Sequence, residues 1–302
     1  MKFLLFSDLH HYPNVFDGGT WEDLGVLQKA AEENECEFMI HAGDFCHGPS
    51  LVPDYVKAYN EFHIPSYHCL GNHDSDKTPI EETLKAYNMP DDHYYFDHGG
   101  YRMIITNPNF YKDGEEYVRY SMGNYYPHAD TRETMPPDQI AWLKETVESS
   151  PYPCIIFSHP SFERCDGVKN RDRILDVIDE ANRKKPHSVL MCINGHHHRD
   201  FVRIRNGVIY WDMNSVSYDW VPNQHDCYPK ELCDEIRLLN HTLVYEDPLY
   251  AIVTVEGTTV TAEGMESSMM LGVTREQSGN VPYDKAGRPV TPTVQSFNIT
   301  LG

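Results

Sequence analysis

The sequence has few basic residues. It carries 25 Lys and Arg against 46 Asp and Glu, which gives a formal net charge of −21. A surface this acidic repels the phosphate backbone of nucleic acids and the head groups of anionic lipids. A nucleic-acid partner is therefore not expected unless a local basic groove or a bound metal reverses the field.

The sequence also has no long apolar run, since no window approaches the ~18 apolar residues that a membrane-spanning helix needs. The first residues, MKFLLFSDLHH, pass directly from a very short apolar run into polar residues, unlike a secretory signal. The eight cysteines form no closely spaced metal-binding pair. We expect a cytoplasmic protein with reduced thiols and no membrane partner, although a chain trimmed of its signal would look the same.

Repeats and low-complexity blocks are absent, and short apolar runs alternate with helical patterns. Strands are predicted over 2–7, 37–43, 66–72, 152–160 and 187–195, and residues 93–106 are predicted to form two strands joined at Gly99-Gly100. Helices are predicted over 21–35, about 52–61, about 79–88, 138–149 and 171–184. This alternation predicts an α/β fold in which two packed mixed β-sheets are flanked by helices, a four-layer α/β/β/α sandwich.

After residue 195 the pattern becomes antiparallel. Asn206-Gly207 and Glu256-Gly257 each separate two apolar runs, which predicts two hairpins. Residues 107–134 and 214–248 read as long Tyr-rich loops, of the kind that often carry function. The tail has no clear periodicity. We therefore predict one domain over 1–265 and a C-terminal extension of unknown role over 266–302.

Polar side chains gather where the predicted strands end. Asp8 and His10 leave the first strand two residues apart, so they are expected to project to the same face, and His196 and His198 repeat this spacing. The candidate metal ligands are Asp8, His10, Asp44, Asn72, His159, His196 and His198. Because an α/β sheet builds its site outside the carboxyl ends of several strands, these residues are expected to meet there.

The donor atoms of these candidate ligands are nitrogen and oxygen only. Imidazoles, carboxylates and an amide suit hard or borderline divalent ions, and the set includes no thiolate that would favour a soft ion. A carboxylate can bridge two ions about 4 Å apart, which is the geometry used in phosphoryl displacement. The set therefore fits two divalent metal ions better than one.

The short motifs run in the order Asp-x-His, Gly-Asp, Gly-Asn-His-Asp, His and Gly-His-x-His over residues 8–198. Any one of them alone is as well explained by a turn or a structural hydrogen bond. Together, each after a predicted strand, they resemble the calcineurin-like metallophosphoesterases. The spacing is most similar to the class III cyclic nucleotide phosphodiesterases and their purple-acid-phosphatase-like relatives. The resemblance implies a metal-dependent phosphoric ester hydrolase.

The resemblance also implies roles. Asp8, His10, Asp44 and His198 would bind the first metal, Asn72, His159 and His196 the second, and Asp44 would bridge them. A hydroxide between the metals would attack phosphorus in line. His73 would act as general acid or as a donor to a phosphate oxygen, and Asp74 would orient its imidazole. The metals could be Mn, Fe or Zn, while the residues beside the motifs include no Tyr that would give a purple Fe(III) centre.

Four further residues are candidates for binding substrate: His11, His47, Asn109 and Tyr125. His11 directly follows a ligand and could instead face the core, and Tyr125 could simply cover it. His47 stands three residues after Asp44, where many family members carry Asp or Asn. The Arg that the Ser/Thr protein phosphatases carry next is absent, which disfavours that subgroup.

The implied substrate is a small phosphodiester, of the cyclic nucleotide or nucleotide-diphosphate type, because the metals can manage its charge within an acidic protein. A phosphomonoesterase acting on a small phosphorylated metabolite is the alternative, since the same residues serve both reactions. A non-catalytic scaffold with this fold is the third hypothesis. It is disfavoured because His73, Asp74 and every candidate ligand are retained.

Overall fold

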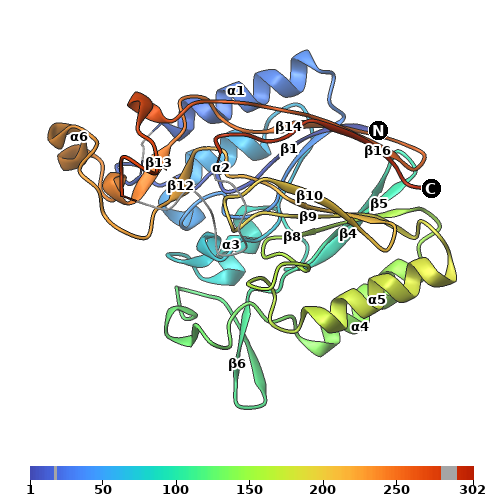
Figure 1. Ribbon diagram of the computed structural model, residues 1–302. Coiled ribbons are helices and arrows are strands. Elements are labelled where there is room, and N and C mark those ends of the chain that lie inside the picture. The colour runs from blue at the N-terminus through green and yellow to red at the C-terminus, as the bar shows by residue number, and fades with distance from the viewer. Residues whose placement is uncertain (17–18, 280–290) are drawn as a thin grey trace.

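The computed structural model describes residues 1–16, 19–279 and 291–302, and it contains two six-stranded sheets (Figure 1). The first sheet has the order β16-β15-β14-β1-β2-β3. Its strands are β1 (Lys2–Phe6), β2 (Phe38–His41), β3 (Ser66–Tyr67), β14 (Ala251–Glu256), β15 (Thr259–Gly264) and β16 (Phe297–Thr300). The second sheet has the order β10-β11-β9-β8-β5-β4. Its strands are β4 (Tyr94–His98), β5 (Tyr101–Ile105), β8 (Cys154–Ser158), β9 (Val189–Asn194), β10 (Phe201–Arg205) and β11 (Val208–Asp212).

Helices cover the outer face of each sheet. The first sheet carries α1 (Thr20–Glu33), α2 (Pro53–Asn60) and α3 (Ile80–Ala86), and the second carries α4 (Pro137–Glu148) and α5 (Arg171–Lys184). Figure 1 shows α1 and the α4–α5 pair on opposite sides of the paired sheets. The remaining helical segments are α6 (Lys230–Glu235), η1 (Pro49–Leu51), η2 (His73–Ser75), η3 (Tyr126–His128), η4 (Leu239–His241) and η5 (Met270–Gly272).

The alternation of side chains along β1 explains the layers. Phe3 and Leu5 lie in the core between the two sheets, whereas Leu4 and Phe6 face the helices. All four are fully buried, as in a strand that has apolar layers on both faces. The predicted four-layer α/β/β/α sandwich is confirmed.

The parallel strands place the carboxyl ends of the two sheets at the same side of the sandwich. β1, β2 and β3 are parallel to one another in the first sheet, as are β5, β8, β9 and β11 in the second. The loops that follow β1, β2, β3, β8 and β9 carry the predicted ligands. The antiparallel hairpins β10–β11 and β14–β15 form where they were predicted.

The structure differs from the predicted elements in three places. β3 covers only Ser66–Tyr67, because the chain leaves the sheet edge early and turns toward the loop after β2. Residues 107–134 contain the hairpin of β6 (Phe110–Asp113) and β7 (Glu116–Arg119), which projects from the body of the protein (Figure 1). Gly114 at its turn has φ 60°, so the Asp113-Gly114 dipeptide was an unused hairpin signal.

The third difference concerns the segments after residue 213. The predicted loop over 214–248 contains the antiparallel pair β12 (Tyr218–Trp220) and β13 (Thr242–Val244). In the tail over 266–302, β16 pairs with β15 at the edge of the first sheet, and Phe297 packs edge-on against Trp211. The end of the tail is thus part of the sandwich, although residues 280–290 lie outside the described part of the chain.

Candidate dimetal site

The predicted ligands for the first metal converge. His10 Nε2 lies 3.1 Å from His198 Nε2 and 3.7 Å from Asp8 Oδ1, and His198 Nε2 lies 3.3 Å from the same oxygen. All three side chains are buried. Their ligand atoms are close enough to coordinate a single ion.

The second set lies next to the first and shares Asp44 with it. Asp44 Oδ2 is 3.0 Å from His159 Nε2 on one side and 3.7 Å from His10 Nε2 on the other. The ligand atoms of Asp44, His159 and His196 form their own cluster. Asp44 therefore lies between the two donor clusters, where the resemblance implies a bridging carboxylate.

The backbone brings the ligands together in a way that strand alternation does not explain. β1 ends at Phe6 and β9 at Asn194, so the four ligands spaced by two residues stand in loops. Asp8, His10, Asp44, His196 and His198 all have a left-handed φ between 49° and 69°. Such conformations are uncommon for non-glycine residues and cluster at functional sites. Asp8 and His10 lie in one donor cluster, whereas His196 and His198 lie in different ones, and strand periodicity explains neither arrangement because all four residues stand in loops.

Three of the four ligand histidines are held through their other ring nitrogen. His159 Nδ1 lies 2.8 Å from the carbonyl oxygen of Ala42, and His198 Nδ1 lies 2.6 Å from that of Tyr218. His10 Nδ1 lies 3.0 Å from His47 Nε2. These contacts fix the three ring orientations, so that Nε2 of each of these histidines faces the centre of the site.

Burial and neighbouring charges shift the pKa values of the ligand histidines in different directions. Burial lowers the pKa of His10 and of His196 to about 3, so both imidazoles are neutral at neutral pH and able to bind a metal. Burial also acts to lower the pKa of His159, but the charges of Asp44 and Asp8 raise it to about 10. A divalent ion would replace that proton as the countercharge to the two carboxylates.

Oδ1 of Asn72 is buried and has no hydrogen-bond partner in the described part of the chain, while Nδ2 of the same residue donates to the hydroxyl of Tyr125 at 3.1 Å. A buried carbonyl oxygen without a partner is costly, and a hard or borderline cation would satisfy it. The residues present therefore fit a pair of divalent metal ions.

His73 lies beside the two metal positions, but Asp74 does not orient it. The backbone N–H of His73 donates to Asp44 Oδ1 at 2.8 Å, and its ligand atom clusters with those of His10 and Asp44. His73 Nδ1 lies 2.6 Å from Asp76 Oδ2. The predicted contact between Asp74 and His73 is wrong, because the turn of η2 brings residue 76 under the imidazole and points residue 74 away from it.

Asp74 holds the loops of the site together. Its carboxylate accepts hydrogen bonds from the backbone N–H groups of Asp44, Phe45, Cys46 and Gly71 and from the hydroxyl of Tyr87. Burial, and after it the charge of Asp44, raise the pKa of Asp74 to about 7, against the hydrogen bonds that lower it. Asp74 thereby fastens the loop after β3 to the loop after β2.

Replacing Asp74 with Ala is expected to destabilise the protein by at least about 3 kcal/mol. The change leaves several buried backbone N–H groups without an acceptor, each costing roughly 1–3 kcal/mol. Urea denaturation measures the loss. Tyr87→Phe, which removes a single donor to the same carboxylate, is the matched control and should cost about 1 kcal/mol. A loss below about 1 kcal/mol for Asp74→Ala would contradict the clamping role.

The four candidate substrate-binding residues occupy different places around the candidate site. His11 stacks on Tyr55 with ring centroids 3.6 Å apart and pairs with Thr20, so it faces the core and not the pocket, and that candidate was wrong. Asn109 Nδ2 donates to the carbonyl oxygen of Leu70 at 2.8 Å, supporting the loop after β3. His47 and Tyr125 contact the ligands His10 and Asn72 and stand behind them.

Several residues near the site were not among the predicted set. Asp76 and Tyr126 lie next to His73, and Asp76 could have been found as the second carboxylate of Asp74-Ser75-Asp76. Phe16 and Trp220 lie beside His10, with ring centroids 6.1 and 6.4 Å from it. Arg275, in the tail, donates to Asp219 and to the carbonyl oxygen of Trp220. No local sequence signal links that arginine to the site.

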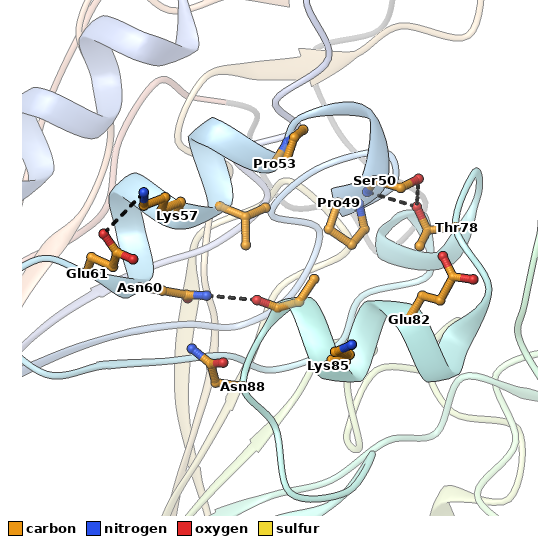
Figure 2. Close-up of a pocket in the computed structure, with 12 residues that line it drawn as sticks. Pro49, Ser50, Pro53, Lys57, Asn60, Glu61, Thr78, Glu82, Lys85 and Asn88 are labelled. Atoms are coloured by element: carbon orange, nitrogen blue, oxygen red, sulfur yellow. Dashed lines mark hydrogen bonds and ion pairs between the residues drawn. The ribbon is translucent and has the colours of Figure 1, made fainter.

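A groove lies between α2 and α3 on the outer helical layer (Figure 2). Ser50 donates to Thr78 Oγ1 at one end, and Asn60 donates to the carbonyl oxygen of Ala86 at the other. None of the predicted ligands lines this groove, which is bordered by Pro49, Ser50, Pro53, Val56, Lys57, Asn60, Glu61, Thr78, Glu82, Lys85, Ala86 and Asn88. The candidate dimetal site is therefore separate from this surface groove.

Two adjoining sets of N and O donors that share one carboxylate, at the carboxyl ends of two packed sheets, define a dimetal hydrolase. The family model of the calcineurin-like phosphoesterases matches residues 1–200. The chain belongs to this family. It is a metal-dependent phosphoric ester hydrolase, and its cofactors are two divalent metal ions.

Two solved structures share the fold along the whole chain. One is a dimetal phosphatase from Danio rerio, with 13% identity, a TM-score of 0.64 and coverage of 100% of this chain and 99% of that one. The other is GAP50, the anchor in the inner membrane complex of Plasmodium, with 12% identity, a TM-score of 0.53 and coverage of 100% and 88%. No curated protein matches the sequence. Among the described residues, none of the helices is long and apolar enough to cross a membrane.

Proposed function

We propose that this enzyme hydrolyses a small phosphodiester, of the cyclic nucleotide or nucleotide-diphosphate type. The observation that carries the proposal is the aromatic wall beside the first metal position, formed by Tyr12, Phe16 and Trp220. Trp220 packs edge-on against Phe16 with centroids 4.9 Å apart, and Tyr12 stacks on His47 at 5.2 Å. Tyr12 and Trp220 are only half-buried, so their rings are available to a nucleobase.

The proposed reaction uses the metal ligands and His73, which lie near the aromatic wall. Bound divalent metals supply an activated water and neutralise charge on the phosphoryl group. His73 is placed to give a proton to the leaving-group oxygen through Nε2, because its Nδ1 is held by Asp76. Burial alone would lower the pKa of His73, but Asp44 and Asp76 raise it above its ordinary value.

The missing arginine supports a diester over a monoester. Gly48 occupies the position next to His47, so that position supplies no guanidinium to hold the extra negative charge of a phosphomonoester. A net charge of −21 also disfavours long polynucleotides. Phosphomonoester hydrolysis remains the alternative, because the two donor sets serve both reactions.

A non-catalytic role is the alternative from another class. The anchor protein GAP50 shares the fold, which shows that the fold also occurs in a protein described by a structural role. Here the observation against it is the complete donor set around Asp44, with His73 beside it. Metal-dependent turnover separates the two hypotheses.

The test is a panel of phosphoesters with protein loaded with Mn, Fe or Zn. It contains p-nitrophenyl phosphate, bis-p-nitrophenyl phosphate, 2′,3′-cyclic and 3′,5′-cyclic nucleotides, and a nucleoside diphosphate sugar. We expect kcat/KM to be highest for a nucleotide diester. Preferred turnover of p-nitrophenyl phosphate would favour the monoesterase, and no turnover with any metal would favour the scaffold.

The variant Trp220→Ala tests the aromatic wall within the same panel. Stacking of a base on an aromatic ring is worth about 1–3 kcal/mol, so KM for the nucleotide substrate is expected to rise about tenfold or more. The KM for bis-p-nitrophenyl phosphate in the same variant, and the KM for nucleotides in Tyr152→Ala, an exposed aromatic outside the wall, are the controls. An unchanged nucleotide KM in Trp220→Ala would contradict the assigned role.

A further inference from the structure

Asp76 is a buried carboxylate surrounded by donors next to the metal site. It stands one residue beyond η2, and its own backbone N–H donates to the carbonyl oxygen of His73 at 3.0 Å. Its side chain is 4% exposed, and its Oδ2 lies 2.6 Å from His73 Nδ1. The hydroxyls of Tyr126 and Tyr125 donate to Oδ2 and Oδ1, each at 2.9 Å. A carboxylate this enclosed is held in one orientation.

The same donors lead from Asp76 to both metal positions. Tyr125 receives a hydrogen bond from Asn72 Nδ2 at 3.1 Å, and Asn72 is a ligand of the second set. His47 Nδ1 lies 3.5 Å from Asp76 Oδ2, while His47 Nε2 contacts the ligand His10 of the first set at 3.0 Å. Asp76 therefore contacts His73 directly, and one intervening side chain separates it from each metal set.

We propose that Asp76 is the positioning residue of the reaction, which holds His73 so that Nε2 faces the leaving-group oxygen. The bond to Nδ1 fixes both the tautomer and the ring angle of the imidazole. His47 lies against the same imidazole with centroids 4.4 Å apart, but it offers a ring and no carboxylate. The Tyr-rich segment around Tyr125 and Tyr126 completes the arrangement by holding Asp76 from the opposite side.

The positioning role of Asp76 rests on the proposed proton donation by His73. A double-mutant cycle distinguishes failure of the first role from failure of the second. The variants are His73→Ala, Asp76→Ala and both together, in metal-loaded protein. Each is measured on a p-nitrophenyl ester, whose leaving group needs little protonation, and on the matching alkyl ester, whose leaving group needs it. Metal content per chain is determined for every variant, so that a lost ion is not mistaken for lost positioning.

We expect Asp76→Ala to lower kcat on the alkyl ester by about 100-fold or more and on the nitrophenyl ester by less than about 10-fold. In the His73→Ala background it should lower kcat by less than about threefold, because the two residues act as one unit. If Asp76→Ala lowered kcat in the His73→Ala background as much as it does in the wild type, the role of Asp76 would be overturned. Unchanged alkyl-ester activity in His73→Ala would instead overturn the proposed proton donor.

A second measurement does not depend on activity. In zinc-loaded protein with ¹⁵N-labelled histidine, the hydrogen-bonded Nδ1–H of His73 is expected to give an imidazole proton signal. Both His73→Ala and Asp76→Ala should remove it, and Tyr126→Phe, which removes a different donor to the same oxygen, should keep it. Should Asp76→Ala not fold, Asp76→Asn, which keeps an acceptor oxygen, should lie between the wild type and His73→Ala in alkyl-ester kcat. Persistence of the signal in Asp76→Ala would overturn the proposal.

Discussion

Replacing Asp44 with Ala is expected to abolish phosphoester hydrolysis and to lower the metal content to below about one ion per chain. Asp44 is the carboxylate that lies between the two donor sets, 3.0 Å from His159 Nε2 and 3.7 Å from His10 Nε2. Its other oxygen accepts the backbone N–H of His73 at 2.8 Å. One substitution thus removes a ligand from each metal and releases the loop that carries the proton donor.

Elemental analysis of dialysed protein measures this loss, with kcat on the preferred substrate as the second readout. The matched control is Asp179→Ala. Asp179 lies on α5, which covers the second sheet, and its carboxylate pairs with Arg205 on β10. That variant should keep both ions and wild-type activity. Retention of two ions by Asp44→Ala would show that Asp44 does not bridge the metals.

Gly71→Ala is expected to have the second large effect, loss of the second metal together with about 3 kcal/mol of stability. A Cβ at residue 71 would lie 2.0 Å from Asp44 Oδ1 and 2.2 Å from the Asp44 backbone nitrogen. The backbone nitrogen cannot move aside as a flexible side-chain end can, so the loop after β3 must shift away from the loop after β2. Asn72, the next residue, would leave the metal position with it.

Thermal or urea unfolding and metal titration measure the two parts of this effect. Gly25→Ala is the matched control, because that glycine lies within α1 and a Cβ there would meet nothing within 4 Å. Alanine is favoured over glycine in a helix by about 1 kcal/mol, so the control should be neutral or slightly stabilising. If Gly71→Ala bound two ions with wild-type affinity, close packing of the two loops would not be needed for the site.

The layers of the fold and the members of the two donor sets were predictable from the sequence. The continuous apolar run of β1, where Phe3 and Leu5 face one side and Leu4 and Phe6 the other, already requires an apolar layer on each face. Motifs placed after strands indicate side chains at a common sheet edge, which is where Asp8, Asp44 and His159 meet. Both inferences depend on local periodicity and chain order, which a sequence contains.

The elements that were missed have weak or short local patterns. β16 has four residues, half-buried and exposed in alternation, and it is defined by its pairing with β15. The β12–β13 pair joins short strands separated by more than 20 residues along the chain. Such strands exist because a partner edge accepts their hydrogen bonds, and no local propensity specifies that edge.

The sequence by itself indicated a two-metal phosphoesterase through its resemblance to the calcineurin-like metallophosphoesterases, whose motifs it carries in the same order. Only the tertiary structure decided which carboxylate near His73 contacts its imidazole and which one binds the backbone of the neighbouring loops. Asp74 and Asp76 differ by two positions, yet Asp74 fastens backbone loops while Asp76 holds the imidazole. The physical reason is the single turn of η2, which sets side-chain directions that no strand or helix period describes.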